Sequence, residues 1–133
     1  MIMETNNCEG AVQKKHNQPF KRYCQTLDLI NDSELIAKYI AAHAEGNHWK
    51  EIREGILQVG ILEMEIYNVD NRLFMIVETK IDFHWEEAFN VLATLPRQNE
   101  WESWMSSFQD IVIGSKADKW KLMNRVFHLY PIV

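Results

Sequence analysis

The chain has 133 residues, of which 47% are hydrophobic and 25% charged, and its formal net charge is −5. This length and composition predict one globular domain with a core of its own, and exclude a fibrous or largely disordered chain. The acidic balance disfavours nucleic-acid and anionic membrane partners. The sequence contains no run of about 18 apolar residues, so no membrane-spanning helix is predicted. The N-terminus does not resemble a secretory signal and two cysteines make no disulfide framework, so we expect a cytoplasmic protein.

The first residues are polar and aperiodic, so residues 1–19 are expected to form a flexible arm before a domain over 20–133. Phe20 to Leu29 alternates in the manner of a strand. A helix then begins with Asn31 or Asp32 as its N-cap. Apolar residues at helical spacing continue this helix to His43 and predict a second helix from Trp49 to Val59, which Gly60 ends.

The second half of the chain is predicted to hold two strands, two helical stretches and a last strand. Strands over 61–67 and 73–79 flank a turn-rich segment and predict a β-hairpin. Helical stretches follow from Asp82 and, beyond Pro96, from Trp101 to Phe108. A polar loop is expected from Gly114 to Lys119, and a last strand over 120–129.

The resulting order, β-α-β-β-α-β, predicts a ferredoxin-like α+β plait, in which helices cover one face of a four-stranded antiparallel sheet. Both faces of the strand Leu73–Val77 are apolar, with Phe74 and Ile76 on the face opposite Leu73, Met75 and Val77. Helices on one side leave the other side uncovered. The pattern therefore predicts a homodimer joined face to face through its sheets, as in dimeric α/β barrels.

Tyr39 and His43 are the sharpest candidates for chemistry, because a spacing of four places both on the apolar face of one helix. Imidazole titrates near neutral pH and suits general acid–base catalysis. The alternative is that both are satisfied polar groups of the core. Trp49, close behind in the chain, has two interpretations as well: a stacking platform for a sugar, or the start of the core stripe of the second helix.

Trp101 and Trp104 share a helix face and belong to the core unless they face the cavity of Tyr39 and His43. A carboxylate in the strands that points inward would need a partner such as Arg125, His128 or a ligand hydroxyl; the candidates are Glu63, Glu65 and Glu78. Only His43 and His48 among the five histidines are close in sequence. A spacing of five puts them on different helix faces, so no metal site is expected.

Several weak motifs follow one another in an order and spacing that resemble the L-rhamnose mutarotase family over about residues 20 to 129. They are Tyr39-Ile40-Ala41-Ala42-His43, which is a Y-x-x-x-H pattern; Trp49-Lys50-Glu51-Ile52, similar to W-P-E-I/L; Gly60; the strand end Ile66-Tyr67; the run from Leu73 to Glu78; Trp101-Glu102-Ser103-Trp104-Met105, similar to W-W-x-x-M; and Val126-Phe127-His128-Leu129, similar to V-F-x-L.

The resemblance implies a dimeric, cofactor-free enzyme that interconverts the α and β anomers of a deoxyhexose. It implies that His43 is the proton donor and that Tyr39 and Trp101 contact the sugar. Where the family has a second tryptophan and a tyrosine, this chain has Glu102 and Met64. These departures leave L-fucose as a rival to L-rhamnose.

The sequence leaves other roles for the same residues open. Trp104 is a candidate to replace the missing ring, and Glu63 and Glu65 are candidates for hydroxyl recognition. Glu102 and Met64, at the two changed positions, are expected to contact the sugar as well. Two alternatives from other functional classes remain: a haem-binding, monooxygenase-type dimer and a non-catalytic sugar-binding dimer.

Overall fold

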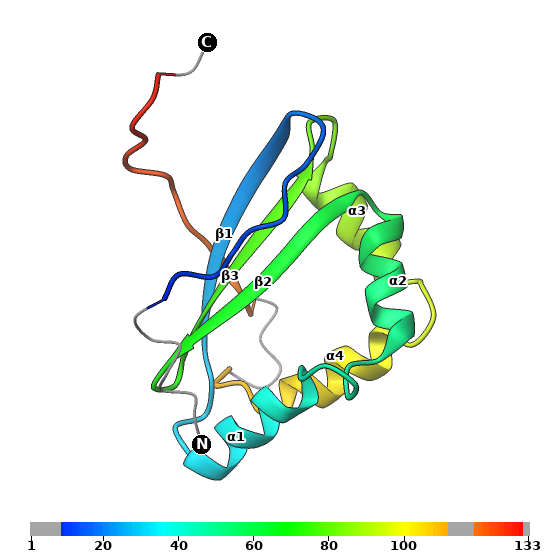
Figure 1. Ribbon diagram of the computed structural model, residues 1–133. Helices are drawn as coiled ribbons and strands as arrows, with labels where there is room; N and C mark the ends of the chain where they lie inside the picture. The colour runs from blue at the N-terminus through cyan, green and yellow to red at the C-terminus, as the bar shows by residue number, and fades with distance from the viewer. Residues whose placement is uncertain (1–8, 112–118, 132–133) are drawn as a thin grey trace.

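The structure is a computed structural model that describes residues 9–111 and 119–131. Four strands and four helices in this part of the chain follow in the order β1, α1, α2, β2, β3, α3, α4 and β4 (Figure 1). The strands are β1 (Phe20–Asp28), β2 (Ile61–Val69), β3 (Arg72–Lys80) and β4 (Lys121–Leu122). The helices are α1 (Ser33–Ala42), α2 (Lys50–Gln58), α3 (Trp85–Leu92) and α4 (Gln98–Ser106). None of these helices is long and apolar enough to cross a membrane.

The strands form one antiparallel sheet in the order β2-β3-β1-β4. β1 pairs with β3 along its whole length, from Phe20 opposite Lys80 to Asp28 opposite Arg72. β2 and β3 form the predicted hairpin, and Asp70 in its turn has a φ of 51°, a left-handed conformation that aspartate tolerates better than most residues. The helices lie on one face of the sheet (Figure 1), so the α+β class and the one-sided cover are confirmed.

The ends of the first two helices follow from local chemistry. The Asp32 side chain accepts hydrogen bonds from the backbone N–H groups of Glu34 and Leu35 at 2.9 and 3.0 Å, which confirms the predicted N-cap of α1. Gly60 follows the end of α2 with a φ of 101°, a conformation that favours glycine because it lacks a Cβ.

The core lies between the sheet and the helices in two clusters. One cluster joins α1, α2 and α4 to one end of the sheet; its largest members are Leu29, Tyr39, Ile52, Leu73, Trp101, Met105 and Phe108. The other lies toward α3 and contains Ile61, Met75, Val77 and Phe83. The aromatic side chains of α1 and α4 therefore meet in one layer, which forms the wall behind the candidate site.

The last strand is much shorter than predicted. β4 pairs with β1 only at Lys121 and Leu122, and the Met123 N–H then donates to the Cys24 carbonyl at 2.8 Å. The strand predicted over 120–129 is therefore confirmed only at Lys121 and Leu122, and the chain leaves the sheet edge after Met123 (Figure 1). Val126 and Phe127 are 94% and 72% exposed, because this segment does not pair with β1, although β1 itself continues to Phe20. Residues 114–118 of the predicted polar loop lie outside the described residues.

The described part of the N-terminal arm crosses the face of the sheet that carries no helices (Figure 1). His16 Nε2 lies 2.8 Å from Glu78 Oε1, and Arg22 Nη2 donates to Glu78 Oε2 at 2.5 Å. Arg22 and His16 thus partner this buried carboxylate in place of the expected Arg125 or His128, which lie on the exposed C-terminal segment. Residues 1–8 of the arm lie outside the described residues.

Candidate active site

His43 stands at the C-cap of α1, one helical turn after Tyr39. Its Nδ1 lies 2.8 Å from the Tyr39 carbonyl oxygen, so Nδ1–H donates to that oxygen and Nε2 is the ring atom left for chemistry. The two rings lie 4.4 Å apart between centroids. Tyr39 is almost fully buried, and burial, with a contribution from Glu102, raises the pKa of its hydroxyl well above the usual value. The phenol therefore stays protonated at every physiological pH.

Trp101 on α4 supports His43 from the side. The indole is buried and meets the His43 ring at 5.2 Å and the His48 ring at 4.7 Å, both in edge-on geometry. Edge-on aromatic contacts are directional and stabilise both partners. Trp101 therefore fixes the orientation of two imidazoles.

The connection between α1 and α2 brings the second histidine to the first. The helix ends at Ala42, Gly46 takes a left-handed φ of 91°, and Asn47 Nδ2 donates to the Ala41 carbonyl at 2.8 Å. The chain reverses here, and the ring centroids of His43 and His48 lie 5.7 Å apart. The prediction that these histidines diverge is therefore wrong, since it assumed one continuous helix.

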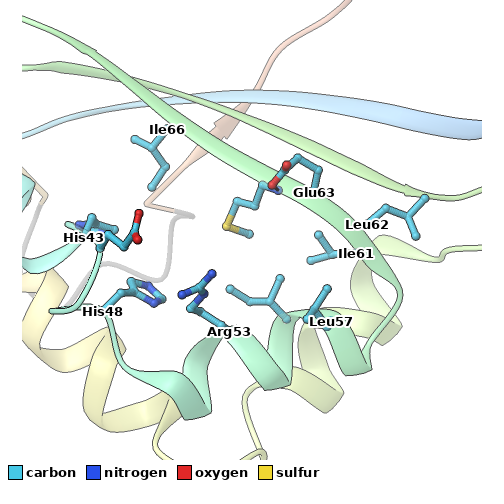
Figure 2. A pocket seen from close by; sticks show the side chains of 11 residues that line it. His43, His48, Arg53, Leu57, Ile61, Leu62, Glu63 and Ile66 are labelled. Carbon is cyan, nitrogen blue, oxygen red and sulfur yellow. Dashed lines mark hydrogen bonds between the residues drawn. The ribbon is translucent and has the colours of Figure 1, made fainter. Parts of the chain in front are cut away.

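A pocket of about 700 Å³ opens in front of both imidazoles (Figure 2). Apolar side chains of α2 and β2 form most of its wall, among them Ile56, Leu57, Ile61, Leu62 and Ile66. Its polar lining is His43, Glu45, His48, Arg53 and Glu63, with Met64 beside them. A mostly apolar cavity with a few converging polar groups is the usual form of a small-molecule site.

Both imidazoles favour the neutral form. Burial lowers the pKa of His43 from its usual value, against a smaller opposite effect of the hydrogen bond to the Tyr39 carbonyl. Burial also lowers the pKa of His48, and the nearby charges of His43 and Arg53 lower it further. Within residues 9–111 and 119–131, no cluster of three or more His, Cys, Asp or Glu side chains could hold a metal ion.

The structure places the predicted site residues at different distances from this pocket. His43 and Met64 line it, whereas Tyr39 and Trp101 pack behind the histidines. Trp49 and Trp104 stack on each other 5.5 Å apart on the far side of Trp101.

The two carboxylates predicted to contact the sugar lie away from the pocket. Glu102 is exposed on α4, where its carboxylate lies 3.3 Å from Lys119 Nζ. Glu65 accepts from Gln13 Nε2 at 3.2 Å on the face of the sheet that the arm crosses. The other strand carboxylate, Glu63, borders the pocket and accepts from the Met64 N–H at 2.9 Å.

Three residues that line the pocket are not among the predicted site residues: Glu45, His48 and Arg53. Arg53 had a detectable signal: it follows the buried Ile52 on α2 and lies one turn before Leu57, and its side chain points toward the pocket (Figure 2). Glu45 and His48 had none, because their positions depend on the turn after α1.

Comparison with known proteins shows the family to which the chain belongs. A UPF0734 protein of Dictyostelium discoideum is 37% identical over 115 residues, covering 83% of this chain and 90% of that protein. A protein of Xanthomonas campestris pv. campestris named L-fucose mutarotase is 34% identical over 114 residues, covering 85% of this chain and 91% of its own. The model of the L-rhamnose mutarotase family matches residues 22–129. The chain belongs to the L-rhamnose mutarotase family.

Proposed function

We propose that this protein is a sugar mutarotase that interconverts the α and β anomers of a 6-deoxyhexose. The observation that carries the proposal is His43, an imidazole oriented by the Tyr39 carbonyl and by Trp101 at the wall of a pocket large enough for one monosaccharide. Membership of the L-rhamnose mutarotase family supports the same reaction.

Anomer exchange requires a proton to leave the anomeric hydroxyl and another to reach the ring oxygen. The ring opens, the free aldehyde rotates about one bond, and the ring closes on the other carbonyl face. In this scheme His43 Nε2 delivers the proton to the ring oxygen while Nδ1 stays bonded to the Tyr39 carbonyl. General acid–base catalysis contributes about 10²–10⁴-fold, which suffices for a reaction that also occurs unaided. The scheme uses no cofactor.

L-Fucose is the first sugar to test, and L-rhamnose is the second. The similar Xanthomonas protein is named for L-fucose, and Met64 stands where the family has a tyrosine that contacts the sugar. The side chains available to bind hydroxyl groups are Glu45, Arg53 and Glu63. Charged groups strengthen hydrogen bonds to sugar hydroxyls in a partly apolar pocket.

We further propose that the fold is a ferredoxin-like plait and that the working unit is a homodimer joined through the sheets. The strand order β2-β3-β1-β4 supports the plait. Two apolar surfaces support the dimer: Phe74 and Ile76 on the face without helices, and the exposed side chains of Val126, Phe127 and Leu129. Phe74 and Ile76 are half-buried, whereas the three C-terminal side chains are exposed, and exposed apolar groups that gather on a surface mark association sites.

Saturation-transfer NMR tests the reaction, because it measures the exchange rate of the two anomers directly. The wild-type protein is expected to accelerate exchange of L-fucose, L-rhamnose or both, and His43→Gln to remove the acceleration while circular dichroism stays unchanged. His84→Gln is the matched control, since His84 is exposed at the start of α3. Sugar binding without acceleration would instead indicate a non-catalytic sugar-binding protein.

A further inference from the structure

His48 is the part of the site that the reaction described above leaves unused. Its ring lines the pocket beside His43, with 5.7 Å between the ring centroids, and it packs edge-on against the same indole of Trp101. His48 Nδ1 is shielded from solvent and meets no partner in good hydrogen-bond geometry among the described residues, and the backbone of Trp49 is near enough to the ring to raise its pKa slightly against the effect of burial. Nε2 is therefore the nitrogen through which this ring exchanges protons with a molecule in the pocket.

Mutarotation acts on two oxygens of one carbon, since the anomeric hydroxyl loses a proton and the ring oxygen gains one. His43 alone serves one of them at a time, because the Tyr39 carbonyl holds its Nδ1 and only Nε2 is free. A second proton-transfer group on the same side of the pocket lets both transfers occur in one transition state.

Building on the proposed mutarotase function, we propose that His48 is a second catalytic residue, which takes the proton of the anomeric hydroxyl while His43 gives a proton to the ring oxygen. The O–H bond of the anomeric hydroxyl breaks and its electron pair forms the aldehyde C=O bond. The bond from the anomeric carbon to the ring oxygen breaks, and its electrons take the proton of His43 Nε2. His43 ends neutral and His48 protonated, and ring closure on either carbonyl face returns the proton.

In this step one of the two imidazoles is protonated and the other is neutral, both before and after ring opening. Two imidazolium charges at this separation repel each other, so the second proton binds less readily than the first. Arg53 opposes protonation of His48 from α2, the other charged groups that line the pocket are Glu45 and Glu63, and the Tyr39 phenol behind His43 stays neutral. The singly protonated pair is therefore the active form.

A bell-shaped pH profile of the exchange rate follows. At high pH the pair has no proton to give, and at low pH it has no neutral ring to accept one. His48→Gln keeps a polar side chain of similar length but cannot take a proton. We expect this variant to lose about 100-fold in L-fucose exchange rate and to lose the acid limb of the profile, while the alkaline limb remains. His84→Gln should match the wild-type curve.

Two outcomes would overturn the inference and leave the mutarotase function standing: an unchanged rate in His48→Gln, or a uniform loss of rate at every pH with both limbs preserved. The second pattern would indicate only a packing or binding role. A wild-type protein that accelerates no deoxyhexose would instead refute the proposed function itself.

A measurement on the unsubstituted protein avoids any doubt about folding of the variant. Nitrogen-15 NMR of the histidine rings follows protonation of each imidazole with pH. We expect His48 to gain its proton over the same pH interval in which the acid limb of the exchange rate falls. An acid limb that appears while His48 stays neutral would contradict the assignment.

Discussion

His43 Nδ1 and the Tyr39 carbonyl oxygen lie 2.8 Å apart within one turn of α1. The helix uses one of its own terminal carbonyls, which would otherwise lack a partner, to set the proton position of the side chain that follows it. Trp101 then holds the ring plane edge-on. The imidazole is thereby oriented before any ligand enters the pocket.

The pH dependence of the reaction tests this environment of His43. Because burial lowers the pKa of His43 and the donor is the protonated ring, protein-catalysed exchange should rise as the pH falls from neutrality, with the midpoint of this limb below 6.5. Exchange rates across a pH series, corrected for buffer alone, provide the measurement. A midpoint above 6.5 would contradict the effect of burial.

Circular dichroism must accompany that pH series. The pKa of His43 is lower in the folded protein than the value of 6.5 expected in the unfolded chain. Its contribution to the stability of the fold is therefore complete at pH values above 6.5. This stabilisation is lost as the pH falls toward the folded pKa, because the unfolded chain binds the proton more readily. Only rates from pH values at which the far-ultraviolet signal stays native report on catalysis.

Trp101 is expected to be a major contributor to stability as well as to the site. Trp101 is 7% exposed and belongs to the same buried cluster as Tyr39 and Met105. Trp101→Ala should therefore lower the free energy of unfolding by about 3–5 kcal/mol. Trp104 on the same helix is 39% exposed, and Trp104→Ala should cost clearly less. Urea unfolding of both variants measures the difference, and equal losses would show that burial does not set the cost.

Glu78 should stabilise the fold in a pH-dependent manner. Burial alone raises the pKa of this carboxyl, but hydrogen bonds from Arg22 and His16 outweigh it and hold the pKa below its usual 4.5. The stabilisation is complete above that value and is lost as the pH falls through the lowered pKa. Glu78→Gln should therefore destabilise the protein by about 1–3 kcal/mol at neutral pH.

The free energies of unfolding of the wild type and of Glu78→Gln should also be compared at acid pH. The gap between wild type and variant should narrow well below pH 4.5, where the carboxylate is protonated in both states of the wild type. Glu9→Gln is the control, because Glu9 is exposed on the arm. A gap of the same size at every pH would mean that shape rather than charge matters at this position.

The N-cap of α1 allows a local test of stability close to the site. Asp32→Ala removes the acceptor of the Glu34 and Leu35 N–H groups and should cost about 1 kcal/mol. Asn31→Ala, at the exposed neighbouring position, should leave thermal unfolding nearly unchanged. Equal effects of the two substitutions would argue against the cap.

Sedimentation velocity tests the proposed dimer. Phe127 is 72% exposed, so Phe127→Asp should weaken self-association without lowering the stability of the single chain. Asn124→Asp adds the same charge to the same segment at a polar position, and it should leave association intact. A wild-type protein that sediments as one chain at high concentration would refute the dimer.

The sequence was sufficient for the features that depend on local chemistry. The Asp32 cap, the end of α2 at Gly60 and the 61–79 hairpin each follow from residues a few positions apart. The placement of Tyr39 and His43 on one helix face depends only on the 3.6-residue period, and the structure brings their rings to 4.4 Å.

Features that depend on where separate segments meet could not be predicted in this way. His48 joins His43 because the helix stops and the chain turns at Gly46, which a spacing of five does not reveal. The alternation over 120–129 suits a strand, but the chain stays beside β1 only up to Met123, opposite Cys24, although β1 continues to Phe20, and alternation alone does not show where pairing stops. Glu65 sits under the arm, a contact between residues 52 positions apart.

The arm over the open face of the sheet has a consequence for how two chains would meet. On the surface that carries Phe74 and Ile76, Gln13 is hydrogen-bonded to Glu65 and His16 is hydrogen-bonded to Glu78. A second copy approaching this face first encounters a polar layer that belongs to the arm of the same chain. In the proposed dimer the arm would therefore lie between the two sheets or be displaced from them, and its length and charge would affect how tightly two copies associate.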